Sequence, residues 1–165
     1  MARARALAPI LLALVLAVGP VAAQGRPLAR PTLPGDAVPA GWTLRVTPDA
    51  TPIAMLDGPG NIRHLALFCL SGEPFLALFF RAPPPPETLR LAFSFADARF
   101  EGEARRESGA GGAHVLALRD QPLASLLAGH DAEVDLAIDG AKAGRLTLRG
   151  SSKAIHAALA PCDGL

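Results

Sequence analysis

Short segments between Trp42 and Arg149 carry apolar residues at every second position, and this period is the strongest constraint on the fold. The first, "WTLRV" (42–46), puts Trp42, Leu44 and Val46 on one face and Thr43 with Arg45 on the other. Such alternation is typical of β-strands with one buried face. "PIAMLD" (52–57) and "HVLALRD" (114–120) are further short strands, and "GPGN" (58–61) and "SGEP" (71–74) are turns.

Two segments, "IRHLALFCL" (62–70) and "FLALFFRA" (75–82), are apolar on both faces. Strands of this kind lie centrally and are covered on both sides. The tetraproline Pro83–Pro86 cannot donate ladder hydrogen bonds, so we expect a connection or an edge there.

The segment "TLRLAFSFADARF" (88–100) reads as one alternating strand, directing inward Leu89, Leu91, Phe93 and Phe95. The glycine-rich "EGEARRESGAGGA" (101–113) predicts an exposed excursion, with a strand as the alternative for its first half. "AEVDLAIDG" (132–140) and "GRLTLRG" (144–150) predict a hairpin whose acidic and basic outer faces meet.

Two helices are expected late in the chain. "DQPLASLLAGH" (120–130) has Asp120 as N-cap and Gly129 at its end. "SSKAIHAALAPC" (151–162) has Ser151 or Ser152 as N-cap and ends at Pro161. Together, these strands and helices predict a mainly β fold. We expect an antiparallel β-sandwich or open barrel of about eight short strands, with a short helix and a C-terminal helix.

Residues 1–23 have the features of a secretory signal peptide. Two arginines precede an apolar run, Gly19 and Pro20 break that run, and "VAA" supplies a small-residue cleavage site after Ala23. The rival interpretation, a retained membrane anchor, needs a longer apolar run. Every later apolar run is interrupted, so we expect no spanning segment. Residues 24–41, with four prolines, predict an extended lead-in, and residues 42–165 a single β-sandwich domain.

The charge of the mature chain excludes one class of partner. Fourteen basic and fifteen acidic residues remain after cleavage, and a near-neutral chain has no electrostatic footprint for nucleic acid. Heavy use of Ala, Gly, Pro and Arg with only two lysines favours a bacterial source with a GC-rich genome. We therefore expect a bacterial periplasmic or secreted protein.

Two cysteines in an exported chain indicate a disulfide. Cys69 shares a strand face with Leu65 and Leu67, and Cys162 follows Ile155 at a spacing that continues the buried stripe of the last helix. A Cys69–Cys162 bond would then fix this helix to a central strand. The alternative is two free buried thiols.

No catalytic or metal-binding pattern emerges. His64, His114, His130 and His156 form no H-x-H or H-E-x-x-H spacing, so a surface position or a hydrogen-bonded, satisfied polar role is expected for each. The serines match no nucleophile motif. Gly109–Gly112, "GAGG", predicts a loop tip rather than a phosphate loop. We expect no cofactor and no metal.

From Trp42 to Cys162 the chain resembles a family of small exported bacterial proteins. The similarity rests on the early Trp strand, "LALFC" with "GEPFLALFF", the helix "PLASLLAG", and "LTLRGSSKAIHAALAPC" with its final Cys. This layout is similar to the invasion-associated locus B family and, more distantly, to periplasmic accessory proteins of type VI secretion loci. The resemblance implies a disulfide-bonded β-sandwich with a non-enzymatic envelope role, and it supplies no catalytic residues.

The leading hypothesis is a non-enzymatic binding or accessory protein whose partner is another envelope protein or surface component. Its expected contact surfaces are Arg105–Gly112 and the edge near the tetraproline. One alternative is a hydrolase assembled from distant loops, for instance from His130, Asp131 and Ser71. The other is a small-ligand carrier, which needs an apolar cavity inside the fold.

Overall fold

The computed structural model describes residues 41–82, 86–129 and 132–162. These three ranges belong to one compact unit. Predictions about the signal peptide and the lead-in lie outside the described residues. The elements, in chain order, are β1 (Thr43–Val46), β2 (Pro52–Asp57), β3 (Ile62–Leu70), β4 (Glu73–Phe80), β5 (Thr88–Ser94), β6 (Arg99–Glu107), η1 (Ser108–Ala110), β7 (Ala113–Ala117), α1 (Leu123–Gly129), β8 (Glu133–Ile138), β9 (Ala141–Thr147) and α2 (Ser151–Leu159).

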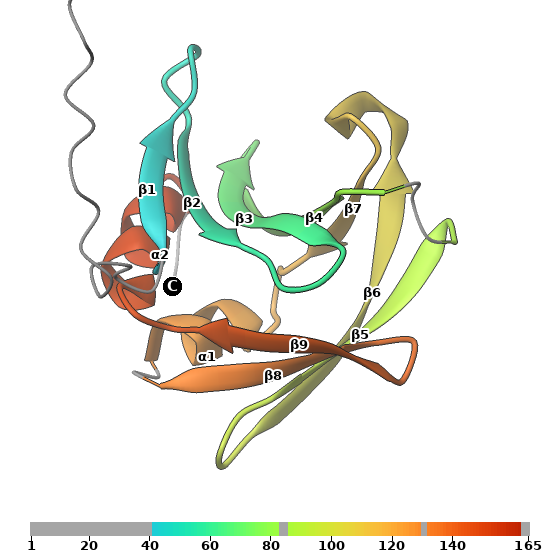
Figure 1. Ribbon diagram of the computed structural model, residues 1–165. Coiled ribbons are helices and arrows are strands. Elements are labelled where there is room, and N and C mark those ends of the chain that lie inside the picture. The colour runs from blue at the N-terminus through green and yellow to red at the C-terminus, as the bar shows by residue number, and fades with distance from the viewer. Residues whose placement is uncertain (1–40, 83–85, 130–131, 163–165) are drawn as a thin grey trace, which may run out of the picture. The chain divides into compact units, whose positions relative to one another are not determined.

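All nine strands form one antiparallel sheet in the order β1-β2-β3-β4-β7-β6-β5-β8-β9. The sheet curls so that its first and last strands approach each other at one end (Figure 1). There the backbone N–H of Trp42 donates to the carbonyl of Arg149 at 2.9 Å, and the Trp42 indole N–H donates to the carbonyl of Thr147 at 3.1 Å. The open-barrel form of the predicted fold is therefore the correct one.

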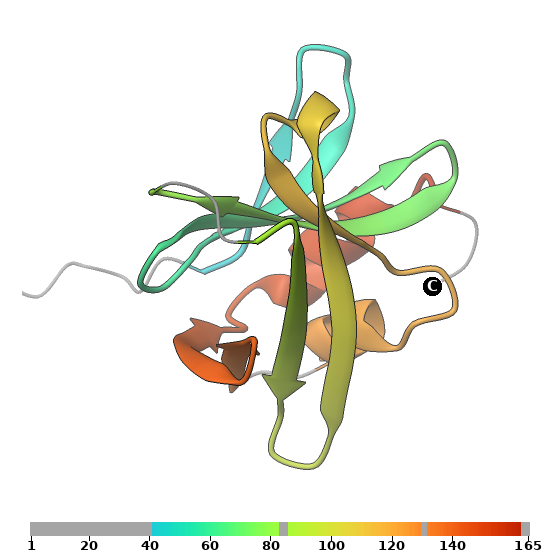
Figure 2. The same cartoon turned by 90° about the vertical axis from the view of Figure 1, so that its right-hand side faces the viewer.

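The middle of the sheet has a Greek-key arrangement. β5, β6 and β7 form a meander that returns to lie beside β4, so the connection from β4 to β5 crosses two strands (Figure 2). The tetraproline belongs to this connection, as expected, although Pro83–Pro85 lie outside the described residues. Its last residue, Pro86, accepts a hydrogen bond at 2.8 Å from Nε2 of His114.

The core lies inside the curled sheet, beneath the two helices. Alternate residues of each central strand point inward, as the period predicted, and α2 covers the inner side of β1, β2 and β3 with Ala154, Ile155, Ala158 and Leu159. The interior is filled by large side chains that are less than 2% exposed: Phe93, Ile62, Leu65, Leu67, Leu76, Leu78, Leu89, Leu91, Leu123, Leu127, Leu136 and Leu146.

The expected single strand over residues 88–100 is wrong, because a turn divides it into β5 and β6. The N–H of Phe95 donates to the carbonyl of Ala98 at 2.8 Å, which closes the turn. Phe95 lies in this turn and is buried. Because it is apolar, the alternating pattern of the sequence continues past the end of the strand. The expected excursion correspondingly begins as β6, the alternative that the sequence allowed.

The predicted helices are present, but their predicted N-cap residues are wrong. Asp120 lies in a left-handed turn (φ 57°), and α1 begins only at Leu123, after Pro122. α2 begins at Ser151, but its N-cap is Gly150, also left-handed, and no side chain caps the helix. Gly150 tolerates this conformation, whereas Ser151 is buried within the first turn.

The hairpin of β8 and β9 has the predicted charge pairing on its outer face. Arg145 lies 3.3 Å from Asp135 and 3.2 Å from Glu133, and Lys142 lies 3.3 Å from Asp135. Hydrogen bonds from Arg145 first, and then from Lys142, hold the pKa of the Asp135 carboxyl below its ordinary value. The turn itself is shorter than expected and consists of Asp139 and Gly140, both at positive φ.

Candidate functional site

The disulfide Cys69–Cys162 is present, with the two Cα atoms 5.6 Å apart. Cys69 points inward from β3, and Cys162 follows the last turn of α2; both are buried. The bond fixes the C-terminal helix to the centre of the sheet, as the sequence predicted. It is structural, and neither sulfur is available as a nucleophile or a metal ligand.

The outer face of β2, β3, β4 and β7 is apolar, and this is the feature that stands out on the surface. We call it the apolar outer face. Pairing in register places side chains in rows across the four strands. The first row is Ile53, Phe68, Phe75 and Ala117, and the second is Met55, Ala66, Ala77 and Val115.

These apolar side chains are only partly buried. Phe68 and Phe75 stack on each other with ring centroids 6.0 Å apart, and both retain intermediate exposure. Ala66 and Ala77, between the larger side chains, are 4% and 1% exposed. Beyond Phe68 the face continues to Leu70, which is 59% exposed. Neighbouring apolar side chains that are partly exposed in this way mark an interaction site more often than isolated apolar residues do.

The outer side of the remaining strands is charged, unlike the apolar outer face. β6 directs outward Arg99, Glu101, Glu103 and Arg105, all exposed, and β8 with β9 adds the ion pairs around Asp135. A sheet with one solvated face alternates apolar inside and polar outside. β5, β6, β8 and β9 obey that rule, whereas β2, β3, β4 and β7 do not.

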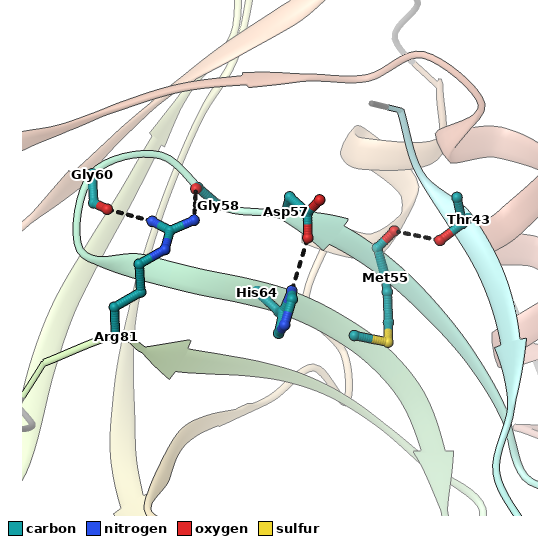
Figure 3. Close-up of polar contacts among 7 residues, drawn as sticks. All are labelled: Thr43, Met55, Asp57, Gly58, Gly60, His64 and Arg81. Carbon is teal, nitrogen blue, oxygen red and sulfur yellow. Dashed lines mark hydrogen bonds and ion pairs between the residues drawn. The ribbon is translucent and has the colours of Figure 1, made fainter. Parts of the chain in front are cut away.

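Charged groups of both signs surround the apolar outer face. Arg45 pairs across from Ile53 at one flank, and Arg105 pairs across from Val115 at the other. Where β2 ends and β3 begins, Nδ1 of His64 lies 2.9 Å from a carboxylate oxygen of Asp57 (Figure 3). The rim therefore has no single dominant sign.

Arg81, just past β4, stabilises the turn between β2 and β3. Its guanidinium donates to the carbonyls of Gly58 and Gly60, the former at 3.2 Å (Figure 3). The same turn lies against β9, since a Cβ on Gly144 would stand 2.5 Å from Cβ of Pro59. Arg81 thus contributes to closing the sheet as well as to the rim.

The described histidines differ in their surroundings, and the buried Nδ1 of His114 has no hydrogen-bond partner among the described residues, contrary to the satisfied role expected of it. His64 has Asp57 on one side and Phe79 on the other in the strand register, so no hydroxyl nucleophile lies in that row. His114 is fully buried beside Phe80, with ring centroids 5.4 Å apart, and His156 is exposed on α2. His130 lies outside the described residues.

The residues named for a hydrolase are not brought together by anything described. Ser71 lies in the exposed turn between β3 and β4, at φ 53°. His130 and Asp131 lie outside the described residues. Among the described residues, no group of three or more His, Cys, Asp or Glu side chains is placed to hold a metal ion.

An open groove of about 730 Å³ lies over β5 and β6. Its charged lining includes Arg90, Arg99, Glu101, Glu103 and Asp139. Arg99 and Glu101 pair with each other, and Asp139 accepts from the N–H of Arg90 at 2.9 Å. The groove is open and lined by charged side chains, so it is not the apolar interior that a small-ligand carrier needs.

The sequence-predicted contact surface at Arg105–Gly112 is the end of β6, the turn η1 and two glycines at positive φ. Arg105 borders the apolar outer face, but the rest of this segment does not belong to it. The sequence pattern had identified β3 and β4 as apolar on both sides and predicted two covered faces. Within the described part of the chain, only the inner face is covered.

Comparison with known proteins adds no assignment, since no family model, curated protein or solved structure matches the chain. The resemblance to the invasion-associated locus B family stays a prediction. In the described segments, neither helix has the length and apolar character required to cross a membrane.

Proposed function

We propose that this chain is an exported, non-enzymatic binding module that docks another protein of the bacterial envelope through the apolar outer face. The observation that carries the proposal is the apolar surface formed by Ile53, Met55, Phe68, Phe75 and Val115 on strands whose inner face is already buried. The disulfide supports an oxidising compartment, the periplasm or the exterior. A place in the invasion-associated locus B family would agree with this role.

The rim favours a protein over a lipid surface or a nucleic acid. Both of those are anionic and select clusters of Lys and Arg. Here Asp57 lies beside the His64 imidazole at one end of the face, and Glu73 pairs with Arg119 at another. Arg45 and Arg105 lie at opposite flanks. An apolar centre with a rim of mixed charge is the usual anatomy of a protein–protein interface.

Site-specific photocrosslinking in the native host tests the proposal. A benzoylphenylalanine in place of Phe75 reports on the apolar outer face, and one in place of Ala92, half-buried on the outer face of β5, is the matched control. We expect one discrete adduct at position 75 and none at position 92. Identical patterns at the two positions would contradict the proposal.

Binding of the identified partner must then depend on the face. The double variant Phe68→Ala/Phe75→Ala should weaken binding by about tenfold or more, because interface aromatics carry much of the binding energy. Glu101→Gln, on the charged half, should leave the affinity unchanged. Unchanged affinity of the Phe68→Ala/Phe75→Ala variant would place the interface elsewhere.

A further inference from the structure

The two edge strands of the sheet differ in how their own chain covers them. The open edge of β9 is covered by Trp42, which bonds the carbonyls of Thr147 and Arg149, and by the turn between β2 and β3, whose Pro59 contacts Gly144. β1 diverges from β9 beyond Trp42 (Figure 1). All four residues of β1 are exposed, so no segment of the described ranges covers its edge.

The hydrogen-bond pattern fixes which groups of β1 face outward. The N–H of Thr47 donates to the carbonyl of Thr51 at 3.0 Å, so odd-numbered residues of β1 bond to β2. The N–H of Trp42, an even-numbered residue, points the other way, to Arg149. The N–H and C=O groups of Leu44 and Val46 therefore face away from β2.

The side chains at these two positions are apolar and exposed. Leu44 is 47% and Val46 is 65% exposed, and they account for two of the three large exposed apolar side chains among the described residues. Natural edges are usually protected by short strands, charges or proline. β1 is short and carries Arg45. However, the two residues whose backbone N–H and C=O groups face outward, Leu44 and Val46, have apolar side chains.

We infer that the edge of β1 accepts an extended strand from a different polypeptide, with apolar residues opposite Leu44 and Val46 and an acidic residue opposite Arg45. Main-chain hydrogen bonds would supply affinity, and the alternate side chains would supply specificity. The edge adjoins the apolar outer face at Arg45, but its backbone groups at Leu44 and Val46 do not belong to that face, so either proposal can fail without the other.

The charge of Arg45 argues against a second copy of this chain as the occupant. Two β1 strands that pair antiparallel over their full length must bond the backbone groups of Leu44 in one copy to those of Val46 in the other. In this register, Arg45 lies directly opposite Arg45 of the second copy. Like charges directly opposite each other destabilise a strand pair. An acidic side chain at the same place would stabilise it.

Amide NMR on the ¹⁵N-labelled, disulfide-bonded chain 24–165 tests this inference. The probe is the capped peptide Lys-Thr-Val-Glu-Val-Thr-Lys, and its control has Lys in place of Glu. We expect the Glu peptide to shift the Leu44 and Val46 amides saturably and slow their exchange, and the Lys peptide to bind about three- to tenfold more weakly. Shifts confined to other residues, or none at millimolar peptide, would overturn the inference.

Variants of β1 separate edge pairing from other contacts. Val46→Pro removes an outward N–H without touching the ladder to β2 and should abolish the response, whereas Val46→Thr keeps the N–H and should retain it. Arg45→Glu should reverse the preference between the two peptides. Equal responses of Val46→Pro and Val46→Thr would contradict main-chain pairing.

The same spectra, recorded without peptide, test two other occupants of the edge: a segment of the same chain and a second copy of the protein. Slow exchange of the Leu44 and Val46 amides in chain 24–165, lost in a chain that begins at Gly41, would mean that the protein covers its own edge. Protection that grows with protein concentration, together with dimer formation in sedimentation, would mean that a second copy binds there. Either result overturns the inference.

Discussion

Removal of the Cys69–Cys162 bond should reduce the free energy of unfolding by more than any single contact in the molecule. The bond closes a loop between residues 93 positions apart. On the chain-entropy model, such a loop corresponds to about 4–5 kcal/mol at 25 °C, an upper value because the reduced chain is not a random coil. For about 120 folded residues this equals a drop in Tm of about 15–20 °C.

Urea unfolding followed by circular dichroism measures this loss, comparing the oxidised protein with the double variant Cys69→Ala/Cys162→Ala. Reductant should lower the urea midpoint of the wild-type chain and leave the double variant unchanged, which controls for other effects of the reductant. If the double variant does not fold, reduction of the wild-type chain during a urea titration gives the same quantity.

The location of the loss can be tested as well as its size. Because Cys162 follows α2, the amides of that helix should lose exchange protection before those of β5 and β6, which lie far from the bond in the sheet order. A loss of less than about 1 kcal/mol, or equal loss of protection throughout the sheet, would refute the idea that the bond fixes this helix to the sheet.

Three further predictions concern closure and charge. Trp42→Phe removes the indole N–H that bonds Thr147 and should reduce the free energy of unfolding by about 1–2 kcal/mol in urea titrations; no change would mean that this contact does not close the sheet. Gly144→Ala places a Cβ 2.5 Å from Pro59 at φ 148° and should cost about 2–3 kcal/mol, whereas Gly109→Ala, with open space around it, should cost less than about 0.5; equal costs would contradict the close approach. In carboxyl NMR titrations Asp135 should protonate below the ordinary Asp value of about 3.9, and Arg145→Ala should raise its midpoint. Since the folded pKa is lowered, the stabilisation that ionised Asp135 provides is present above the ordinary value and is lost as the pH falls through the lowered one; an unmoved midpoint would contradict the pairing.

Much of the fold could be predicted because period and turn residues are local signals. The bounds of β2 and β3 coincide with the segments that the alternation marks, and the hairpin of β8 and β9 has the expected charge pairing. The disulfide followed from the same logic, since Cys69 continues one strand face and Cys162 one helix stripe. Each of these inferences starts from a pattern that can be read within one element at a time.

The failures occur where local identity does not determine backbone conformation. Phe95 continues the apolar alternation of β5, but its backbone enters the turn that leads to β6. Asp120 and Ser151 are good capping residues by type, yet the chain uses Pro122 and Gly150 at the corresponding boundaries. A proline already lacks the N–H that a cap would satisfy, and a glycine adopts the left-handed turn into α2 at no steric cost.

The candidate binding surfaces show a second limit of prediction from sequence, which concerns whether a strand face is covered. Alternation tells which residues share a face, but it does not tell what lies over that face. Leu44 and Val46 share a face with buried Ala54, yet they lie at an open edge beyond the reach of the core. Phe68 and Phe75 share a face with buried Ala66 and Ala77, yet the strands curl that face outward. Apolar residues in a strand were therefore a sound indication of sheet structure and an unsound indication of burial. Because the exposed part of an apolar side chain adds no stability to the fold, the exposed apolar surface at these two places favours a role in binding.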